Sequence, residues 1–329
     1  MKHKHSPQIP CLLSIIACAL LLSGLLTTAH AAAPMAKTQV PCYYRMMLGQ
    51  FEITALADGF SDMDLLRLRN APEAKIRGLI DRNFAFYPKV KTPVNAYLIN
   101  TGVSLVLVDA GGGEGMGPAF ANVIRNMKAA GYDPAQVDAV LITHMHRDHV
   151  GGLLTPEGKP AFPKALIYIS KVESDYWLSL AVAEKAPPEM ERYFKMARDA
   201  ADPYKALGRL YTFESGNLPI AGIKAILTPG HTPGHCVFEV KSGSDTLLII
   251  GDLVHNVAVQ SALPEVAISF DTDQKQAVAV RQAVFKSAAK DKVLIAGMHI
   301  PFPGIGHLRA EGENSYTWVP IDFAPLSAP

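Results

Sequence analysis

The chain is poor in cysteine and carries almost no net charge. It has 329 residues and four cysteines, two of which, Cys11 and Cys18, fall in the N-terminal segment. The other two, Cys42 and Cys236, are too far apart in sequence to specify a disulfide, so their state stays open. Lys and Arg number 31 against 30 Asp and Glu. Because no basic excess is available to hold a phosphate backbone, we expect no nucleic-acid partner.

Phosphate-binding motifs are also missing. The run Gly111-Gly112-Gly113 follows an apolar segment, but no G-x-x-x-x-G-K-[ST] or G-x-G-x-x-G pattern follows a strand there. We interpret these glycines as a tight turn that lets the backbone pass close to a site. The sequence shows no internal repeat, low-complexity tract or linker.

The N-terminus has the pattern of a secretory signal. Lys2 and Lys4 precede an apolar stretch from Cys11 to Leu26, and Ala29-His30-Ala31 matches a cleavage site. The stretch is short for a membrane span and runs straight into small residues. We therefore expect residues 1–31 to be a signal peptide, the protein to be exported to a periplasm or secreted, and no stable membrane anchor to remain after cleavage.

The rest of the chain, residues 32–329, is long enough for one large domain, and we expect a single domain. Helical periodicity covers 118–130 and 274–290, and 171–210 is mostly helical with a break at Pro187-Pro188. Apolar strand patterns cover 51–57, 93–100, 103–109, 139–143, 165–169, 224–227, 237–240, 246–250 and 293–296. This order predicts an α+β protein with two mixed sheets between helical layers. A doubly wound parallel sheet fits less well, because short turns join the strands between 224 and 250.

Three imidazoles and a carboxylate lie within six residues, in the run Thr143-His144-Met145-His146-Arg147-Asp148-His149. This combination of nitrogen and oxygen ligands suits Zn²⁺ or another first-row metal. Three further segments end in a side chain of the same kind, and their residues are His231, Asp252 and His299. The pattern therefore predicts a metal site assembled from distant strand ends, which is typical of a hydrolase.

The H-x-H-x-D-H run together with His231, Asp252 and His299 resembles the metallo-β-lactamase superfamily over nearly the whole mature chain. Within it, the stretches 43–46, 51–56 and 302–312 resemble methyl parathion hydrolase and its exported lactonase and arylesterase relatives. The resemblance implies an αββα sandwich with two divalent metal ions at one edge. We expect zinc, with Mn²⁺, Co²⁺ or Fe²⁺ possible at the second site.

The resemblance also implies roles for the ligands. His144, His146 and His231 would hold one metal, Asp148, His149 and His299 the other, and Asp252 would bridge them. A hydroxide shared by the metals would attack the substrate, with Asp252 as bridge and Asp148 placed to shuttle a proton. Asp109, at a strand end, would orient a ligand imidazole; a simple turn cap is an equal alternative.

Two substrate classes fit: lactones or aryl esters, and phosphotriesters such as methyl parathion. Where methyl parathion hydrolase has leucine, threonine and leucine, this chain has His255, Ile268 and Phe270. A flat phenyl ring favours an aryl lactone or ester, so we rank that class first, with phosphotriesterase activity alongside. The residues expected to line the pocket are Met116, Trp177, Phe194, His255, Ile268 and Phe270; ordinary core packing is the alternative for each.

Other functions remain as minor alternatives. Glutathione-thioester hydrolases share all seven ligands, and a non-catalytic binding or sensor protein could use the same scaffold. A homodimer is possible, since relatives are often dimers. The natural substrate is not determined by the ligand pattern.

Overall fold

We analysed a computed structural model of the chain, which describes residues 33–324 and 326. The predicted signal peptide lies outside the described residues. The described residues from Pro41 onward form one compact unit, and residues 33–40 have no regular secondary structure. Among the described helices, none is both long enough and apolar enough to span a membrane.

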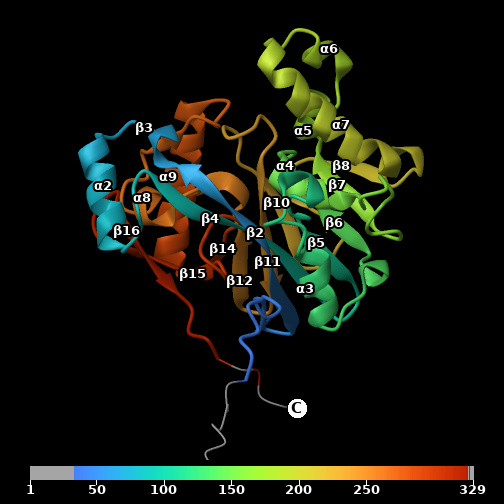
Figure 1. The fold of residues 1–329 in the computed structure, drawn as a ribbon, viewed down its shortest axis with the longest axis horizontal. Coiled ribbons are helices and arrows are strands. Elements are labelled where there is room, and N and C mark those ends of the chain that lie inside the picture. The colour runs from blue at the N-terminus through green and yellow to red at the C-terminus, as the bar shows by residue number, and fades with distance from the viewer. Residues whose placement is uncertain (1–32, 325, 327–329) are drawn as a thin grey trace, which may run out of the picture. The chain divides into compact units, whose positions relative to one another are not determined.

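The first sheet combines an antiparallel half with a parallel half (Figure 1). Strands β1, β2, β4 and β5 pair antiparallel, and β5 to β8 pair parallel. In spatial order its strands are β1 (Tyr43–Leu48), β2 (Phe51–Asp64), β4 (Lys89–Asn100), β5 (Leu105–Val108), β6 (Ala139–Leu141), β7 (Leu166–Ser170) and β8 (Leu210–Phe213).

The second sheet is antiparallel except for one parallel pair, β12 with β14. Its spatial order is β16 (Tyr316–Pro320), β15 (Ile305–Ala310), β14 (Leu294–Ala296), β12 (Asp245–Ile249), β11 (Cys236–Ser242), β10 (Ile223–Leu227) and β9 (Gly216–Asn217). A separate short pair joins β13 (Ala267–Ile268) to β3 (Leu68–Arg69).

Helices cover the outer faces of both sheets. The first sheet packs against α3 (Val123–Ala129), α5 (Lys171–Trp177) and α7 (Glu191–Ala206), and the second against α9 (Gln274–Asp291). The remaining helices are α2 (Glu73–Arg82), α4 (Arg147–Val150), α6 (Leu180–Ala183) and α8 (Val257–Gln260). Short 3-10 turns are η1 (Leu65–Arg67), η2 (Glu114–Met116), η3 (Pro134–Gln136), η4 (Gly151–Leu153), η5 (Pro188–Met190) and η6 (Gly251–Leu253).

The layers follow from strands that are apolar on both faces. In β5, Leu105 and Leu107 face the helix-covered core, whereas Val106 and Val108 face the core between the two sheets. Side chains alternate along a strand, so a buried central strand is a continuous apolar run. The expected α+β sandwich with αββα layers is confirmed.

One predicted helix is shorter than expected. Residues 118–130 show helical periodicity, but α3 begins only at Val123. The carboxylate of Asp58, buried under the sheet edge, accepts hydrogen bonds from the backbone N–H groups of Asn122 and Val123. A carboxylate at this position satisfies N–H groups that the first helical turn leaves free, so a residue distant in sequence sets where the helix begins.

Candidate metal centre

Parallel neighbouring strands position most of the predicted ligands. β5 and β6 are parallel in the first sheet, and β12 and β14 in the second. Carboxyl ends of parallel strands meet at one edge, and the residues that follow these four ends include Asp109, His144, Asp252 and His299. His231 lies in the connection between β10 and β11.

One group of side chains consists of His144, His146, His231 and Asp252, whose donor atoms lie within 4.8 Å of one another. Nδ1 of His146 is 3.0 Å from Nε2 of His144 and 3.0 Å from Nε2 of His231. Oδ2 of Asp252 is 3.5 Å from Nε2 of His144 and 3.3 Å from Nε2 of His231. Four potential ligand atoms therefore surround one point.

A second group consists of Asp148, His149 and His299. Nε2 of His299 is 3.4 Å from Oδ2 of Asp148, and Nε2 of His149 is 3.7 Å from Oδ1 of the same carboxylate. Oδ1 of Asp252 lies 3.1 Å from Nε2 of His149 and 3.2 Å from Nε2 of His299. Oδ2 of Asp252 thus lies beside the first group and Oδ1 beside the second, while Nε2 of His299 is 3.2 Å from both oxygens. A carboxylate between two groups is the arrangement that a bridging ligand needs.

The chemistry and spacing of these atoms fit two divalent cations. Ligands at 2.0–2.1 Å from a tetrahedral zinc stand about 3.3 Å apart, and the distances above bracket that value. Nε2 of His149 and Oδ1 of Asp252 are also buried, and neither has a hydrogen-bond partner among the described residues. Buried polar atoms are rarely left unpaired, so these two point to an ion between them.

Burial alone would lower the pKa of every ligand imidazole, but the nearby carboxylates, Asp252 among them, raise the pKa of His149, His231 and His299. For the other two histidines burial prevails. It lowers the pKa of His144 well below its usual value and that of His146 to about 3, which leaves neutral imidazoles with free lone pairs. Burial alone would raise the pKa of Asp252, but the imidazoles of His149 and His299 hold it well below its usual range. The Asp252 carboxylate is therefore ionised.

Asp109 has the contacts expected of a residue that orients a ligand. Its Oδ2 accepts hydrogen bonds from Nδ1 of His149, at 2.7 Å, and from the Thr143 hydroxyl, at 2.7 Å, while Oδ1 accepts from the Thr143 N–H. Burial raises the pKa of Asp109, and His149 acts against that shift. A carboxylate bonded to Nδ1 leaves Nε2 of His149 free to face the site.

Two further orienting residues were not predicted. Oδ1 of Asp271 lies 2.9 Å from Nδ1 of His231, which fixes that ring in the same way. Nε2 of His235 accepts the backbone N–H of Asp252 at 3.0 Å. His235 closes the histidine-containing run 228–235 and could have been identified there, whereas nothing local in the sequence identifies Asp271.

Glu173 was also missed, and it links the two ligand loops. Its Oε1 accepts the Met145 N–H at 2.8 Å, and its Oε2 accepts the Thr232 hydroxyl at 2.8 Å and the Gly234 N–H at 2.9 Å. Burial raises its pKa, and these hydrogen bonds oppose the shift. Met145 lies between His144 and His146, and Thr232 follows His231, so one carboxylate ties both loops together.

The glycine run packs against the histidine run. The Gly152 N–H donates to the Gly111 carbonyl at 2.9 Å, and the Gly112 N–H donates to the Asp58 carboxylate at 2.8 Å. A Cβ on Gly151 would lie 2.1 Å from the Gly112 carbonyl oxygen. Only glycine allows these two backbones to approach so closely, and the contact fixes the C-terminal end of the ligand run.

Of the six predicted wall residues, Met116 and Phe270 have exposed surface, whereas Trp177 and His255 are buried beside the ligands. The Trp177 ring stands edge-on to His146, 5.6 Å between centroids, and Met116 is partly exposed beside Gly112. Nε2 of His255 lies 3.2 Å from Oδ2 of Asp252. Phe270, which is 42% exposed, lies 6.1 Å from the His255 ring. His255 and Phe270 therefore form a wall beside the Asp252 carboxylate.

The other two predicted wall residues lie in the core. Phe194 and Ile268 have no exposed surface, so contact of either side chain with a substrate stays a prediction. Phe194 packs behind Trp177 at 4.9 Å between ring centroids, because α7 turns that face toward the first sheet. Ile268 pairs with Leu68 in the short β13–β3 ribbon. Both residues support the wall from behind.

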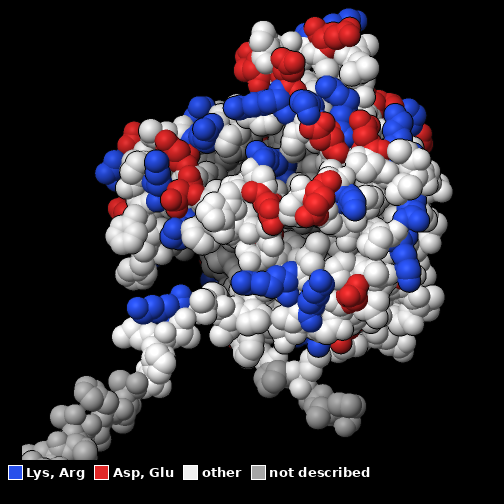
Figure 2. Space-filling model, turned by 45° about the vertical axis from the view of Figure 1, so that its right-hand side comes forward, with Lys and Arg blue, Asp and Glu red and all other residues white. Residues whose placement is uncertain are grey.

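The cysteines and the surface charge bear on two further predictions from the sequence. Cys42 and Cys236 are both free, with Cys236 buried between the sheets. Basic and acidic side chains are interspersed over the face in Figure 2. The absence of a nucleic-acid partner stays a prediction.

Known proteins share both the fold and the sequence signature. A sequence model of the metallo-β-lactamase superfamily matches residues 90–299, a range that contains all seven predicted ligands. The solved hydrolase AbOPH of the β-lactamase superfamily is 39% identical, with a TM-score of 0.84 over 88% of this chain and 100% of that one. AidC, a dizinc quorum-quenching lactonase solved with N-hexanoyl-L-homoserine as product, is 25% identical, with a TM-score of 0.79 over 86% and 99%.

Similarity to curated proteins is more partial. A ribonuclease of Thermus thermophilus is 33% identical over 163 residues, which is 48% of this chain and 35% of the ribonuclease. The chain spans about a third of the length of that relative. The match of the superfamily model over most of the chain, with the sandwich and the ligand geometry, shows that the chain belongs to the metallo-β-lactamase superfamily of metal-dependent hydrolases.

Proposed function

We propose that the protein is a dinuclear metal-dependent hydrolase that opens lactones or cleaves aryl esters, with weaker phosphotriesterase activity. The observation that carries the proposal is Asp252, whose carboxylate lies between two separate ligand groups beside the wall of His255 and Phe270. The likeness to AidC, described as a dizinc lactonase, supports the lactone class. The likeness to AbOPH, described only as a hydrolase, is compatible with either class.

In this proposal the predicted ligands form two sets, one for each metal ion. Bound metal ions would supply a water of lowered pKa and polarise the substrate oxygen. His144, His146 and His231 would hold one ion, and Asp148, His149 and His299 the other. Asp252 would fix the distance between them.

The more exposed residues would handle protons and position the substrate. The Asp148 side chain is 23% exposed, whereas that of Asp252 is 3% exposed, so Asp148 can exchange a proton with the attacking water and the leaving oxygen. Nε2 of His255 lies 3.2 Å from Oδ2 of Asp252, which keeps this imidazole beside the carboxylate. The Phe270 ring gives an aryl group a flat surface to stack on.

The test is a parallel panel of kcat/KM values for an aryl lactone, an acyl-homoserine lactone, p-nitrophenyl acetate and methyl parathion. We expect the aryl lactone or the aryl ester to give the highest value and methyl parathion a lower one. Asp252→Asn should abolish all four activities and reduce the metal content. Highest activity on methyl parathion would make the phosphotriesterase alternative correct, and cleavage of an RNA oligonucleotide with none of the four esters would refute the proposal.

We also propose that residues 1–31 are removed on export. The basic residues, apolar stretch and small-residue site described above support this proposal. Mass spectrometry of the protein from separated cell fractions tests it. An intact N-terminus on protein found in the cytoplasmic fraction would contradict it.

A further inference from the structure

We propose that residues 65–91 form a surface that binds reversibly to membranes containing anionic lipids. This surface, here named the 65–91 surface, consists of η1, β3, α2, the loop after α2 and the start of β4. Figure 1 shows α2 and β3 together at one side of the fold. The proposal does not depend on which bond the enzyme hydrolyses.

The first observation is a pair of phenyl rings held in water. Phe84 is 94% exposed and Phe86 is 85% exposed, and Leu66 on η1 is 55% exposed. Phe84 follows the end of α2 with φ 54°, a left-handed conformation that glycine or asparagine usually supplies at this position. Because it is 94% exposed, the Phe84 ring gains almost no stability from burial within the protein. The ring is therefore available for contact with an external apolar phase.

The second observation is the charge around these rings. Residues 65–91 contain seven Lys or Arg and two Asp or Glu, a net charge of +5, whereas the rest of residues 33–329 contains 22 and 28, a net charge of −6. All seven cations are exposed. Arg77 pairs with Glu73, and Lys91 pairs with Asp62. The other five have no carboxylate within 4 Å among the described residues: Arg67, Arg69, Lys75, Arg82 and Lys89.

Aromatic rings flanked by unpaired cations match an anionic bilayer surface. Rings enter the boundary between headgroups and acyl chains, while Lys and Arg remain with the phosphates. Each cation near such a surface adds to the attraction, which decays within a Debye length. A second copy of this chain would bring the same +5 surface against itself, so a lipid surface is the better partner.

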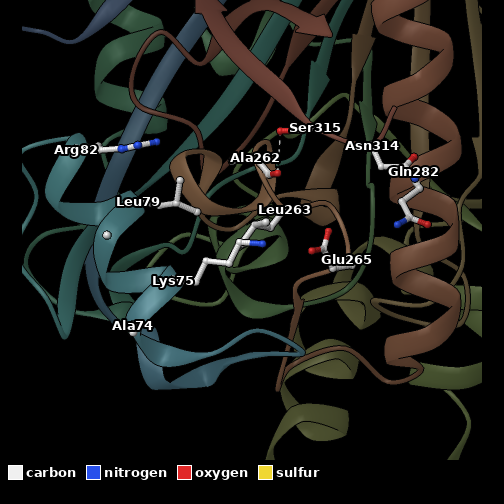
Figure 3. A pocket seen from close by; sticks show the side chains of 11 residues that line it. Ala74, Lys75, Leu79, Arg82, Ala262, Leu263, Glu265, Gln282, Asn314 and Ser315 are labelled. Carbon is white, nitrogen blue, oxygen red and sulfur yellow. Dashed lines mark hydrogen bonds between the residues drawn. The ribbon is translucent and has the colours of Figure 1, made fainter. Parts of the chain in front are cut away.

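A cavity beside α2 adds room for headgroups. Its volume is about 920 Å³, and Lys75 and Arg82 line one wall (Figure 3). Asn314 and Ser315 lie across it, and Glu265 contributes one carboxylate to the opposite side. The two cations suit a phosphate, so the cavity extends the same chemistry from the surface into the fold.

The 65–91 surface also adjoins the candidate active site. β3 is hydrogen-bonded to β13, and the Arg67 guanidinium lies 4.8 Å from the centre of the Phe270 ring. Phe270 is in turn the neighbour of His255. Binding through this surface would therefore bring the wall of the site close to the membrane.

Co-sedimentation of the purified protein with vesicles tests the proposal. The vesicles are phosphatidylcholine alone, or phosphatidylcholine with about 30% phosphatidylglycerol, at low and high salt. We expect binding to the anionic vesicles only, weakened at high salt. Phe84→Ser with Phe86→Ser should weaken binding at least about tenfold, and Arg82→Glu with Lys89→Glu should abolish it.

A matched control substitutes exposed apolar residues elsewhere. Val103 is 94% exposed and Leu207 is 55% exposed, so Val103→Ser with Leu207→Ser should leave both binding and thermal unfolding unchanged. Equal binding to neutral and anionic vesicles, no binding to either, or wild-type binding by the Phe84/Phe86 variant would overturn the proposal. So would light scattering that shows a dimer which the Phe84/Phe86 variant dissociates, since a second copy would then occupy the surface.

Discussion

Glu173 should be as important for metal retention as the ligands themselves, although it belongs to neither ligand group. Its carboxylate is 1% exposed and accepts three hydrogen bonds, from Met145, Thr232 and Gly234. Glu173→Gln preserves the shape of the side chain. The amide still accepts one N–H, but its NH₂ group faces the remaining donors.

The expected cost follows from the hydrogen bonds that are lost. A hydrogen bond to a charged group contributes about 1.5–3 kcal/mol, and an unsatisfied buried donor adds to the loss. The Thr232 hydroxyl can rotate to accept from the new NH₂ group, whereas the Gly234 N–H cannot. We therefore expect Glu173→Gln to lower the free energy of unfolding by about 3 kcal/mol, which lowers Tm by about 6–12 °C in a protein of this size.

The assay pairs thermal unfolding with metal analysis of the same preparation. Loosening of either loop moves ligands relative to one another, so bound metal per chain should fall together with Tm. Glu184→Gln, at an exposed position after α6, is the control and should change the free energy of unfolding by less than about 0.5 kcal/mol. If Glu173→Gln unfolds within about 1 kcal/mol of the wild type and retains its full metal content, Glu173 does not hold the loops together.

The other predictions use the same logic at single contacts. Asp109→Asn places an NH₂ group against Nδ1 of His149 and should weaken metal affinity about 10–100-fold in a competition with a chromophoric chelator; unchanged affinity would make Asp109 a turn cap. Asp271→Ala frees the ring of His231 and should weaken affinity by a similar factor, with restoration by Asp271→Glu not expected because the longer chain misplaces the oxygen. Burial raises the pKa of Tyr204 to about 12, so the folded protein keeps this proton while the unfolded chain loses it near pH 10. Stability should therefore fall between pH 10 and about 12 by about 1.4 kcal/mol per unit, and Tyr204→Phe should flatten that part of a urea-unfolding pH profile; an unchanged slope would contradict this. His255→Leu with Phe270→Leu should raise kcat/KM for methyl parathion and lower it for an aryl lactone, about tenfold each; a fall in both would show that these residues do not select the substrate.

The sandwich and the convergence of the ligands could be predicted because both follow from short, continuous segments of the sequence. The apolar runs of the central strands are continuous, as in 105–108, and the candidate ligands follow directly where such runs end. The residues that follow strand ends at one edge of a sheet lie close together, so the strand ends found in the sequence already indicate which residues are neighbours. The short 3-10 turns, β3 and β13 were not predicted, because two or three residues carry no periodicity.

Supporting residues could not be predicted for a different reason. Ser170-x-x-Glu173 matches a capping box, and the Ser170 hydroxyl does accept the Glu173 N–H. The capping interpretation would point the Glu173 carboxylate back at its own helix, whereas the structure turns it toward two loops that are 28 and 59 positions away. Asp58 and Asp271 likewise act on residues 64 and 40 positions away. Such contacts depend on how the layers pack, and no local pattern encodes them.

The same argument explains why the ligand set says little about the substrate. The seven predicted ligands belong to segments whose positions the sandwich fixes, and proteins with different printed activities, a lactonase and a ribonuclease, are similar to this chain. The wall is different, because Phe270 follows the two-residue strand β13, which pairs with β3 and packs through Ile268. A substitution in β3, such as Leu68→Ala, would shift β13 and with it Phe270, and would leave the strands that carry the ligands in place. Substrate preference can therefore change through residues that touch neither the metals nor the substrate, and the β3–β13 ribbon is where this chain is most open to such change.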